Sequence, residues 1–156
     1  MSSEKKTVLI TGAGHGIGKA TAKLMAARGW AVGVNDLKEE FALEAVAEIE
    51  AAGGTAFPVV QNVATREGVE TAIAAVLERT ERLDGLVNNA AWVRYQAVPD
   101  IAPETVDRML QVGFSGVIWG IQAAVAAMDP ERGGTIVNVA SAAGFRSAPR
   151  SLVYSG

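Results

Sequence analysis

Residues 7–18, Thr-Val-Leu-Ile-Thr-Gly-Ala-Gly-His-Gly-Ile-Gly, contain the pattern that decides the fold. Residues 7–11 are mostly β-branched and apolar, which predicts a buried strand. Four glycines follow within seven residues, and residues 17–28 then have the spacing of an amphipathic helix. Glycines allow a tight turn and let backbone N–H groups approach an anion at the positive end of the helix. This order of elements therefore predicts a phosphate-binding turn.

Three phosphate-binding patterns compete for this turn. A Walker loop fails because Ala13 stands where its first glycine belongs and Ala20 where its hydroxyl residue belongs. The GxGxxG dinucleotide pattern fails because Ile17 occupies the place of the last glycine. The pattern TGxxxGxG remains. A glycine-rich turn without any ligand is the alternative, so the neighbouring sequence has to decide between the two.

Asp36 supplies that context, because it ends the second predicted strand eighteen residues beyond Gly18. A carboxylate at this place can accept hydrogen bonds from the adenosine ribose hydroxyls, and it repels a 2′-phosphate. The next basic residue is Lys38. Asp36 therefore favours NAD over NADP, although a solvated turn aspartate is the alternative. His15, the only histidine, lies inside the turn, and we expect it to border the adenosine phosphate rather than to transfer protons.

Strand-like and helical segments alternate along the whole chain. Further strands are expected at residues 30–36, 55–63, 86–89 and 135–140, and helices at 38–52, 65–82 and 103–128. Phe41 and Leu77 are expected on the inward faces of the first two of these helices, and Pro58 indicates that the third strand lies at or near an edge. The alternation predicts an α/β fold with a doubly wound parallel sheet in three layers. We expect a single domain over residues 1–156.

Composition and charge exclude several classes of function. The absence of cysteine removes disulfides, thiolate metal sites and a cysteine nucleophile, and it suits a reducing cytosol. The net charge of −3 gives no basic stripe for nucleic acid. No stretch reaches the roughly 18 apolar residues of a membrane helix, and the opening residues do not resemble a signal peptide. We expect a soluble cytoplasmic protein with no metal and with no nucleic-acid or membrane partner.

Together these residues resemble the short-chain dehydrogenase/reductase family over nearly the whole chain. Its TGxxxGxG turn matches residues 11–18, and Asn88-Asn89-Ala90-Ala91 stands where the family carries NNAG. Ser141 follows the fifth strand, and Tyr154 comes thirteen residues later, which is the family's usual spacing. The resemblance implies a Rossmann-like sheet with strands in the order 3-2-1-4-5 and with NAD lying across their carboxyl ends.

The resemblance also implies a function for each matching residue. Asn62 and Val63 would border the adenine, and Asn89 with Ala90 would border the ribose. Ser141 would orient the substrate oxygen while Tyr154 exchanges its proton, as a hydride passes between nicotinamide and an alcohol or carbonyl carbon. The expected cofactor-binding residues are Gly12, His15, Gly16, Ile17, Gly18, Asp36, Asn62, Val63, Asn89, Ala90, Ala91 and Tyr154. The expected substrate contacts are Ser141, Trp92 and Arg94.

The chain departs from the family pattern at several positions. Asn62 replaces an aspartate, and Ala91 replaces the glycine of NNAG. Gly113 occupies the place of the asparagine that completes the catalytic group, and close packing or ligand access would explain a glycine there. A phenol also needs a cationic neighbour to act as a base near neutral pH. The family's lysine, in the pattern YxxxK, would come two residues after Gly156, and all five lysines precede residue 39.

Members of the family are longer than this chain. We therefore expect the amino-terminal portion of an NAD-dependent oxidoreductase, truncated before its carboxyl-terminal third, whose full-length form is a homodimer or homotetramer. The missing lysine and Gly113 leave an alternative open, a non-catalytic dinucleotide-binding fragment or regulatory module. A nucleoside triphosphatase is disfavoured because the Walker residues fail. The expected substrate is a small alcohol or carbonyl compound.

Overall fold

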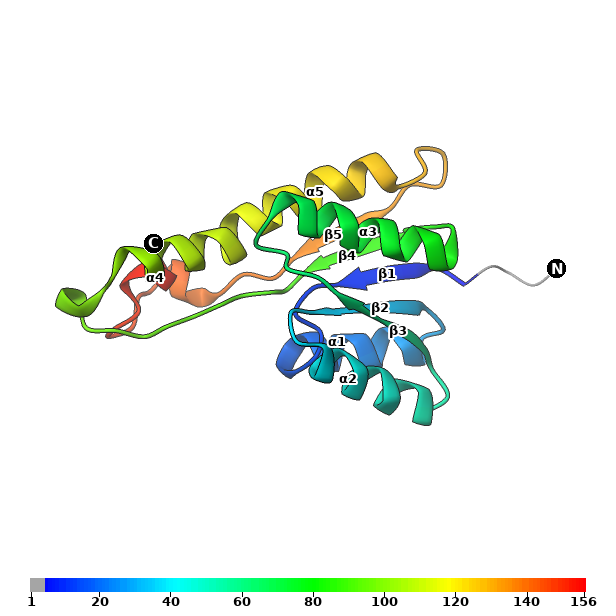
Figure 1. Ribbon diagram of the computed structural model, residues 1–156, viewed down its shortest axis with the longest axis horizontal. Helices are drawn as coiled ribbons and strands as arrows, with labels where there is room; N and C mark the ends of the chain where they lie inside the picture. The colour runs from blue at the N-terminus through cyan, green and yellow to red at the C-terminus, as the bar shows by residue number, and fades with distance from the viewer. Residues whose placement is uncertain (1–4) are drawn as a thin grey trace.

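The sheet in the computed structural model, which describes residues 5–156, has five parallel strands in the order β3-β2-β1-β4-β5 (Figure 1). The central strand, β1, pairs with β2 on one side and with β4 on the other. The predicted parallel sheet and strand order are therefore confirmed. The strands are β1 (Thr7–Ile10), β2 (Ala31–Asp36), β3 (Thr55–Val60), β4 (Gly85–Asn88) and β5 (Thr135–Asn138).

Helices cover both faces of the sheet and complete the three predicted layers. The helices are α1 (Gly16–Ala27), α2 (Glu39–Ala51), α3 (Arg66–Thr80), α4 (Pro103–Leu110), α5 (Gly116–Ala127) and α6 (Leu152–Ser155). Figure 1 shows α1 and α2 on one face and α3 and α5 on the other. Val8 and Ile10 belong to the apolar core under α1 and α2, and Leu9 belongs to the core under α3 and α5. This division follows from the alternation of side chains along a strand.

The strand β3 ends at Val60, three residues before the predicted end. The side-chain amide of Asn35 donates hydrogen bonds to the carbonyl oxygens of Val59, at 2.9 Å, and Gln61, at 3.0 Å. This buried side-chain amide therefore occupies two carbonyl oxygens of the chain that would otherwise accept backbone hydrogen bonds from β2 in a longer strand. Pro58 lies in β3, which among the described strands pairs only with β2. The prediction that Pro58 marks an edge is confirmed.

The helical spacing predicted for residues 103–128 is confirmed, with a π-helical turn (Gln111–Ser115) between α4 and α5. The side that packs on the sheet, however, carries small residues rather than the large apolar ones. Gly116, Gly120 and Ala124 are the buried residues of α5. An ideal Cβ on Gly116 would collide with the carbonyl oxygen of Val63, and one on Gly120 with the Oδ1 atom of Asn88. The close approach of α5 therefore requires these glycines.

Several large apolar residues of this helix lie on its opposite, solvent-facing side. Phe114 and Val125 are each 63% exposed, and Leu110 is 47% exposed. Apolar periodicity marks the helix correctly, but it does not identify the face that meets the sheet. That face is decided by which side chains permit close contact with β4 and with the chain around Val63.

Residues 103–127 form a helix long and apolar enough to cross a membrane by length and composition alone. The expectation that no stretch would reach this length is therefore wrong. One such helix is weak evidence of a membrane protein, because a core helix of a soluble protein passes the same test. In this structure α5 lies against α3 and β4. The absence of a membrane partner stays a prediction.

The packing of α5 predicts opposite effects for two glycine substitutions. Gly120→Ala adds a methyl group against the buried side chain of Asn88 and should lower the free energy of unfolding by about 1–3 kcal/mol. Gly113→Ala is the matched control, since an ideal Cβ there meets nothing within 4 Å. Removing a helix glycine should raise the free energy of unfolding, by about 1 kcal/mol at most. Urea denaturation measures both, and equal stabilities of the two variants would contradict this account.

Candidate cofactor-binding site

The glycine-rich turn connects β1 to α1 at the carboxyl-terminal edge of the sheet (Figure 1). Gly12 has a φ of +61°, a left-handed conformation that L side chains rarely adopt. A Cβ on Gly12 would also come within 2.9 Å of the Cα atom of Ala90. At Gly18 the limit is space alone, because a Cβ there would collide with the carbonyl oxygen of Gly12 and lie 2.5 Å from the Nδ2 atom of Asn89. The turn therefore folds tightly over the start of α1.

Hydrogen bonds between Thr11 and Asn89 hold this turn against the end of β4. The hydroxyl of Thr11 accepts from the backbone N–H groups of Asn89 and Ala90, each at 3.0 Å. The side-chain amide of Asn89 donates to the carbonyl oxygens of Thr11, at 2.9 Å, and Gly12, at 3.1 Å. Two motifs that lie 78 residues apart in the sequence therefore form one rigid unit.

Asp36 ends β2 beside the turn, and its carboxylate is held in place by backbone donors. Its Oδ2 atom accepts from the N–H of Gly14 at 3.2 Å, and its Oδ1 atom accepts from the N–H of Lys38 at 3.0 Å. The Nδ1 atom of His15 lies 3.5 Å from Oδ2. The ring of Phe41, in α2, lies beside the His15 ring with their centroids 5.5 Å apart.

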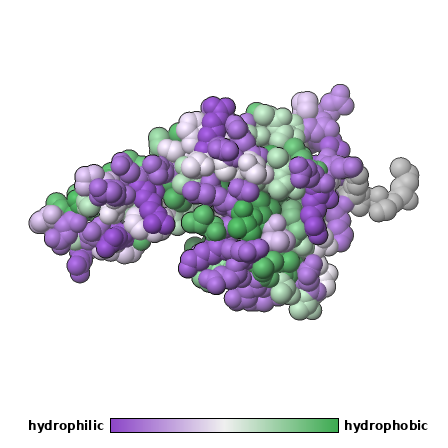
Figure 2. Space-filling model, in the orientation of Figure 1, coloured by the Kyte–Doolittle hydropathy of each residue, from purple (hydrophilic) through white to green (hydrophobic). Residues whose placement is uncertain are grey.

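A cavity of about 490 Å³ lies between the turn and the ends of β2, β3 and β4. In Figure 2 the outline of the molecule is indented between the arm that carries α4 and the body that carries α1 and α2. The cavity lining includes Trp92 and most of the expected cofactor-binding residues: Gly12, His15, Gly16, Ile17, Asp36, Asn62, Val63, Asn89, Ala90 and Ala91. Gly18 is not among the lining residues, since it is buried beneath the turn.

Several lining residues were not expected from the sequence. Leu37 and Lys38 directly follow Asp36, so their position in the chain was a usable signal. Phe41 is half-buried at the cavity and lies under the Nζ atom of Lys38, 4.8 Å from its ring centroid, instead of in the core beneath α2. Arg108 comes from α4, with its guanidinium 4.5 Å from the centroid of the Trp92 ring. No local pattern marks Arg108, because only the tertiary fold brings α4 to the cavity.

Ser141, Tyr154 and Arg94 are not among the residues that line this cavity. Ser141 follows β5, is exposed, and its hydroxyl accepts from the N–H of Ala143 at 3.1 Å. Tyr154 lies half-buried in α6, with its ring edge-on to Tyr95 at a centroid distance of 6.4 Å. Arg94 is exposed. The catalytic functions of Ser141 and Tyr154 stay predictions.

Gly113 lies in the π-helical turn with open space around it. Close packing was one of the two reasons expected for a glycine at this position, and among the described residues nothing packs there. That explanation is therefore wrong for this structure. Over residues 5–156, no group of three or more histidine, cysteine, aspartate or glutamate side chains could hold a metal ion.

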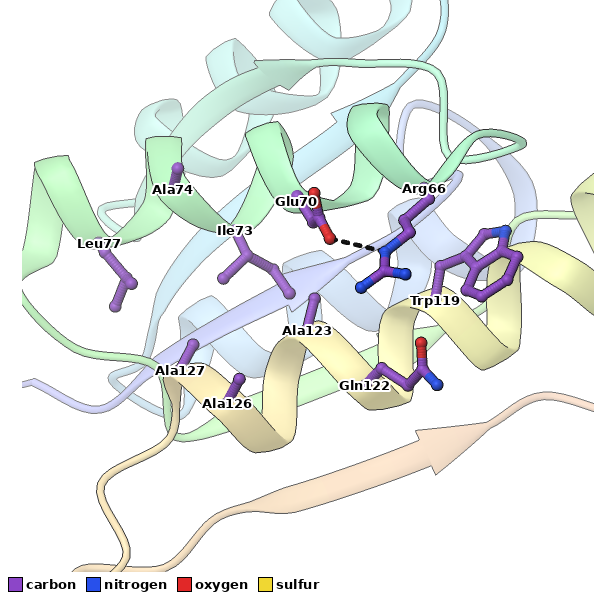
Figure 3. A pocket seen from close by; sticks show the side chains of 10 residues that line it. All are labelled: Arg66, Glu70, Ile73, Ala74, Leu77, Trp119, Gln122, Ala123, Ala126 and Ala127. Atoms are coloured by element: carbon purple, nitrogen blue, oxygen red, sulfur yellow. Dashed lines mark hydrogen bonds and ion pairs between the residues drawn. The ribbon is translucent and has the colours of Figure 1, made fainter.

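A second hollow, of about 350 Å³, lies between α3 and α5 (Figure 3). Arg66 lies above the ring of Trp119 and pairs with Glu70 at 2.9 Å, so these charged groups compensate each other. The rest of the lining is Ile73, Ala74, Leu77, Gln122, Ala123, Ala126 and Ala127. None of the expected site residues lies here. The cavity at the glycine-rich turn is therefore the candidate site.

The strand order, the glycine-rich turn and the cavity at the carboxyl ends of the strands define a Rossmann-like nucleotide-binding domain. The family model for short chain dehydrogenases matches residues 6–156, and the chain belongs to that family. The family consists of oxidoreductases that bind a nicotinamide dinucleotide. The family resemblance and the Rossmann-like fold expected from the sequence are both confirmed.

Three relatives illustrate the match. The chain is 41% identical over 155 residues to an uncharacterized oxidoreductase of Thermotoga maritima, covering 99% of this chain and 61% of that protein. It is 37% identical over 156 residues to the 1-cyclohexenylcarbonyl-CoA reductase of Streptomyces collinus, covering 99% of this chain and 55% of that protein. The structure of NAD+-bound xylitol dehydrogenase matches with a TM-score of 0.90 at 30% identity, covering 99% of this chain and 60% of that one. The chain thus spans about three fifths of the length of these relatives.

The hydrogen bonds of Thr11 predict that its hydroxyl is needed for a stable turn. Thr11→Val keeps the shape but leaves the half-buried N–H groups of Asn89 and Ala90 without their acceptor. An unpaired donor costs about 1–3 kcal/mol when fully buried, so at these half-buried positions the free energy of unfolding should fall by about 1–2 kcal/mol. Urea denaturation measures this loss. Thr11→Ser keeps the hydroxyl and should lose much less; a valine variant as stable as the serine variant would refute the proposed contribution of these bonds.

Proposed function

We propose that the chain belongs to an NAD-dependent oxidoreductase that transfers a hydride between nicotinamide and an alcohol or carbonyl carbon of a small molecule. The observation that carries the proposal is the buried carboxylate of Asp36 at the cavity, beside the glycine-rich turn. Because the chain spans only part of its relatives, the activity is proposed for the whole protein. Its expected cytoplasmic location and its homodimeric or homotetrameric state belong to the same proposal.

The residues at the cavity fit the adenosine half of NAD. A carboxylate has about four lone-pair sites, and backbone N–H groups use two of those on Asp36. The remaining two lone-pair sites can accept hydrogen bonds from the hydroxyls of the adenosine ribose. The turn at Gly12, His15, Gly16 and Ile17, supported from beneath by Gly18, offers a pyrophosphate the positive end of α1. A volume of about 490 Å³ lies within the range of small-molecule sites.

In this proposal Asn62 and Val63 border the adenine, and Asn89 with Ala90 and Ala91 borders the ribose. The Oδ1 atom of Asn62 already accepts from the N–H of Ala64 at 3.1 Å, and its second lone pair can accept from the adenine amine. An asparagine can therefore serve where the family has an aspartate. Asn89 contributes chiefly by fixing the turn, since its amide N–H groups are bound to the carbonyl oxygens of Thr11 and Gly12.

For the chemical step, the bound cofactor supplies hydride transfer, and the chain supplies Ser141 and Tyr154. The hydroxyl of Ser141 orients the substrate oxygen, and Tyr154 holds and moves its proton. A tyrosine acts as a base near neutral pH only beside a cation, and all five lysines of the chain precede residue 39. This observation favours the second candidate, a non-catalytic dinucleotide-binding fragment or regulatory module, for the 156-residue chain alone.

The substrate is proposed only as a class. One relative is named as a reductase of a coenzyme A thioester and a structural neighbour as a dehydrogenase of a polyol, so reductions and alcohol oxidations both occur among similar proteins. Trp92 lines the cavity beside Arg108 and is our candidate substrate contact. Arg94 and Ser141 complete the proposed substrate residues, although neither lines the cavity of this chain.

Cofactor preference tests the assignment of Asp36. Titration calorimetry should show tighter binding of NAD+ than of NADP+ to the unmodified protein. Asp36→Ala removes charged hydrogen-bond acceptors, each worth about 1.5–3 kcal/mol, and should weaken NAD+ binding by about tenfold or more. The same variant should bring the affinities for NAD+ and NADP+ closer together. Asp36→Asn is the control that keeps one acceptor oxygen. Its NAD+ affinity should lie between that of the unmodified protein and that of Asp36→Ala. Tighter binding of NADP+ by the unmodified protein would reject the assignment.

Turnover distinguishes the two candidate functions. The full-length enzyme should reduce NAD+ with a secondary alcohol, measured by the absorbance of NADH. Tyr154→Phe removes the proposed proton-transfer group and should lower kcat by about 100-fold or more. Tyr95→Phe is the matched control, because Tyr95 touches the ring of Tyr154 and has no proposed part in proton transfer. Undiminished turnover by Tyr154→Phe would exclude the proposed mechanism, and turnover by the 156-residue chain itself would exclude the non-catalytic alternative.

A further inference from the structure

Arg108 brings a positive charge to the cavity from α4, the helix on the arm side of the indentation in Figure 2. Its guanidinium lies over the ring of Trp92, 4.5 Å from the ring centroid, and both side chains line the cavity. Among residues 5–156 this guanidinium forms no ion pair and no hydrogen bond. The cavity therefore contains a cation whose N–H donors are not used by the described part of the chain.

An acidic partner for Arg108 is available on the same helix. Glu104 lies four residues before Arg108 in α4, and a glutamate at this spacing ordinarily forms a favourable pair with a following basic residue. The pair is not formed within the described residues, and Arg108 lies over the indole instead. Contact with an aromatic face leaves the planar fork of N–H donors free to bind an anion. Trp92 thus holds the charge at the cavity without neutralising it.

The other hollow of the molecule provides a comparison. In α3, Arg66 lies over the ring of Trp119, and it also pairs with Glu70, four residues away, at 2.9 Å (Figure 3). An arginine can therefore lie over an indole and bind a carboxylate on its own helix at the same time. Arg108 has the indole and lacks the carboxylate. Its charge is the one left for a ligand.

The Arg108–Trp92 pair belongs to two segments that flank the proposed proton-transfer group. Tyr95 comes three residues after Trp92, and its ring is edge-on to that of Tyr154, with a centroid distance of 6.4 Å. On the other side, α4 lies against α6, the helix that carries Tyr154 (Figure 1). A molecule that reacts at Tyr154 therefore has this cation within the neighbouring part of the structure.

We propose that Arg108, held on Trp92, is a specificity-determining residue that binds an anionic group of the substrate. The substrate is then a carbonyl or alcohol compound that also carries a carboxylate or a phosphate, and a guanidinium fits both of these with two parallel hydrogen bonds. The inference rests on the proposed function and deepens it by naming the charge of the substrate. The cofactor pyrophosphate is not the expected partner, because the proposed function gives it the positive end of α1.

The test compares ketones that differ in charge, with reduction by the full-length enzyme followed through the absorbance of NADH. Levulinate carries a carboxylate, and levulinamide is its uncharged analogue. Dihydroxyacetone phosphate carries a phosphate, and dihydroxyacetone is its uncharged parent. For at least one pair, kcat/KM should be about tenfold or more higher for the anionic member, as expected for a charged hydrogen bond. The pair that shows the preference identifies the anion as a carboxylate or a phosphate.

Arg108→Met removes the charge and keeps a long side chain that favours a helix. It should raise KM for the preferred anionic compound by about tenfold or more, and it should change kcat/KM for the uncharged partner by about threefold at most. Arg108→Lys keeps the charge but not the planar fork, so it should retain part of the preference. Arg79→Met is the matched control, because Arg79 also lies over an aromatic ring, that of Phe57, and does not line the cavity. It should leave the preference unchanged.

Trp92→Leu tests the contribution of the ring. It should lower the preference for the anionic compound when Arg108 is present and leave it unchanged in the Arg108→Met background, since Trp92 acts on the anion through Arg108. Equal kcat/KM values within both pairs, or no reduction of either anionic compound by an enzyme that binds NAD+, would overturn the inference. So would an Arg108→Met variant that keeps the preference and loses NAD+ affinity, which would assign the guanidinium to the cofactor. Failure of the unmodified enzyme to bind NAD+ would instead overturn the proposed function and, with it, the inference.

Discussion

The hydrogen bonds between Thr11 and Asn89 are the interaction on which the site depends. They tie the end of β1 to the end of β4. Because β1 and β4 are adjacent parallel strands, their carboxyl ends meet at one edge, and the two motifs can bond directly. These bonds fix the position of the turn relative to the end of β4. A phosphate-binding turn built from backbone N–H groups depends on a fixed backbone conformation more than on any particular side chain.

Asp36 gives the cavity its chemical character. Backbone N–H groups of Gly14 and Lys38 donate hydrogen bonds to its carboxylate at a nearly buried position. Gly14 is essential to this arrangement, since a Cβ there would lie 2.7 Å from the Oδ2 atom. The glycines of the turn therefore do two things: they let the turn approach the Asp36 carboxylate, and in the proposed site they make room for a phosphate.

In the helix α5, the side that packs on the sheet carries small residues, although an amphipathic pattern usually predicts that the large apolar side chains face the core. Its small residues, Gly116, Gly120 and Ala124, face the sheet, whereas Val125 faces outward, as does Phe114 in the π-helical turn before α5. Small residues are selected by the short distance between α5 and the chain around Asn88 and Val63. The close approach also supports the site, because Asn88 immediately precedes the Asn89 that holds the turn. The packing of α5 and the geometry of the cavity are therefore linked through β4.

The sequence by itself determined the strand–turn–helix unit, the parallel sheet and the position of Asp36, because each depends on local pattern and on spacing along the chain. It also located most of the residues that the structure brings to one cavity, through motifs that sit at the ends of strands. Only the tertiary structure decided that β3 ends at Val60, where the side-chain amide of Asn35 donates hydrogen bonds to the carbonyl oxygens of Val59 and Gln61. It alone decided that Phe41 and Arg108 reach the cavity and that Ser141 and Tyr154 do not line it. The physical reason is the same in each case: periodicity reports which residues are apolar and which elements form, whereas contacts between distant segments decide which side of an element is covered.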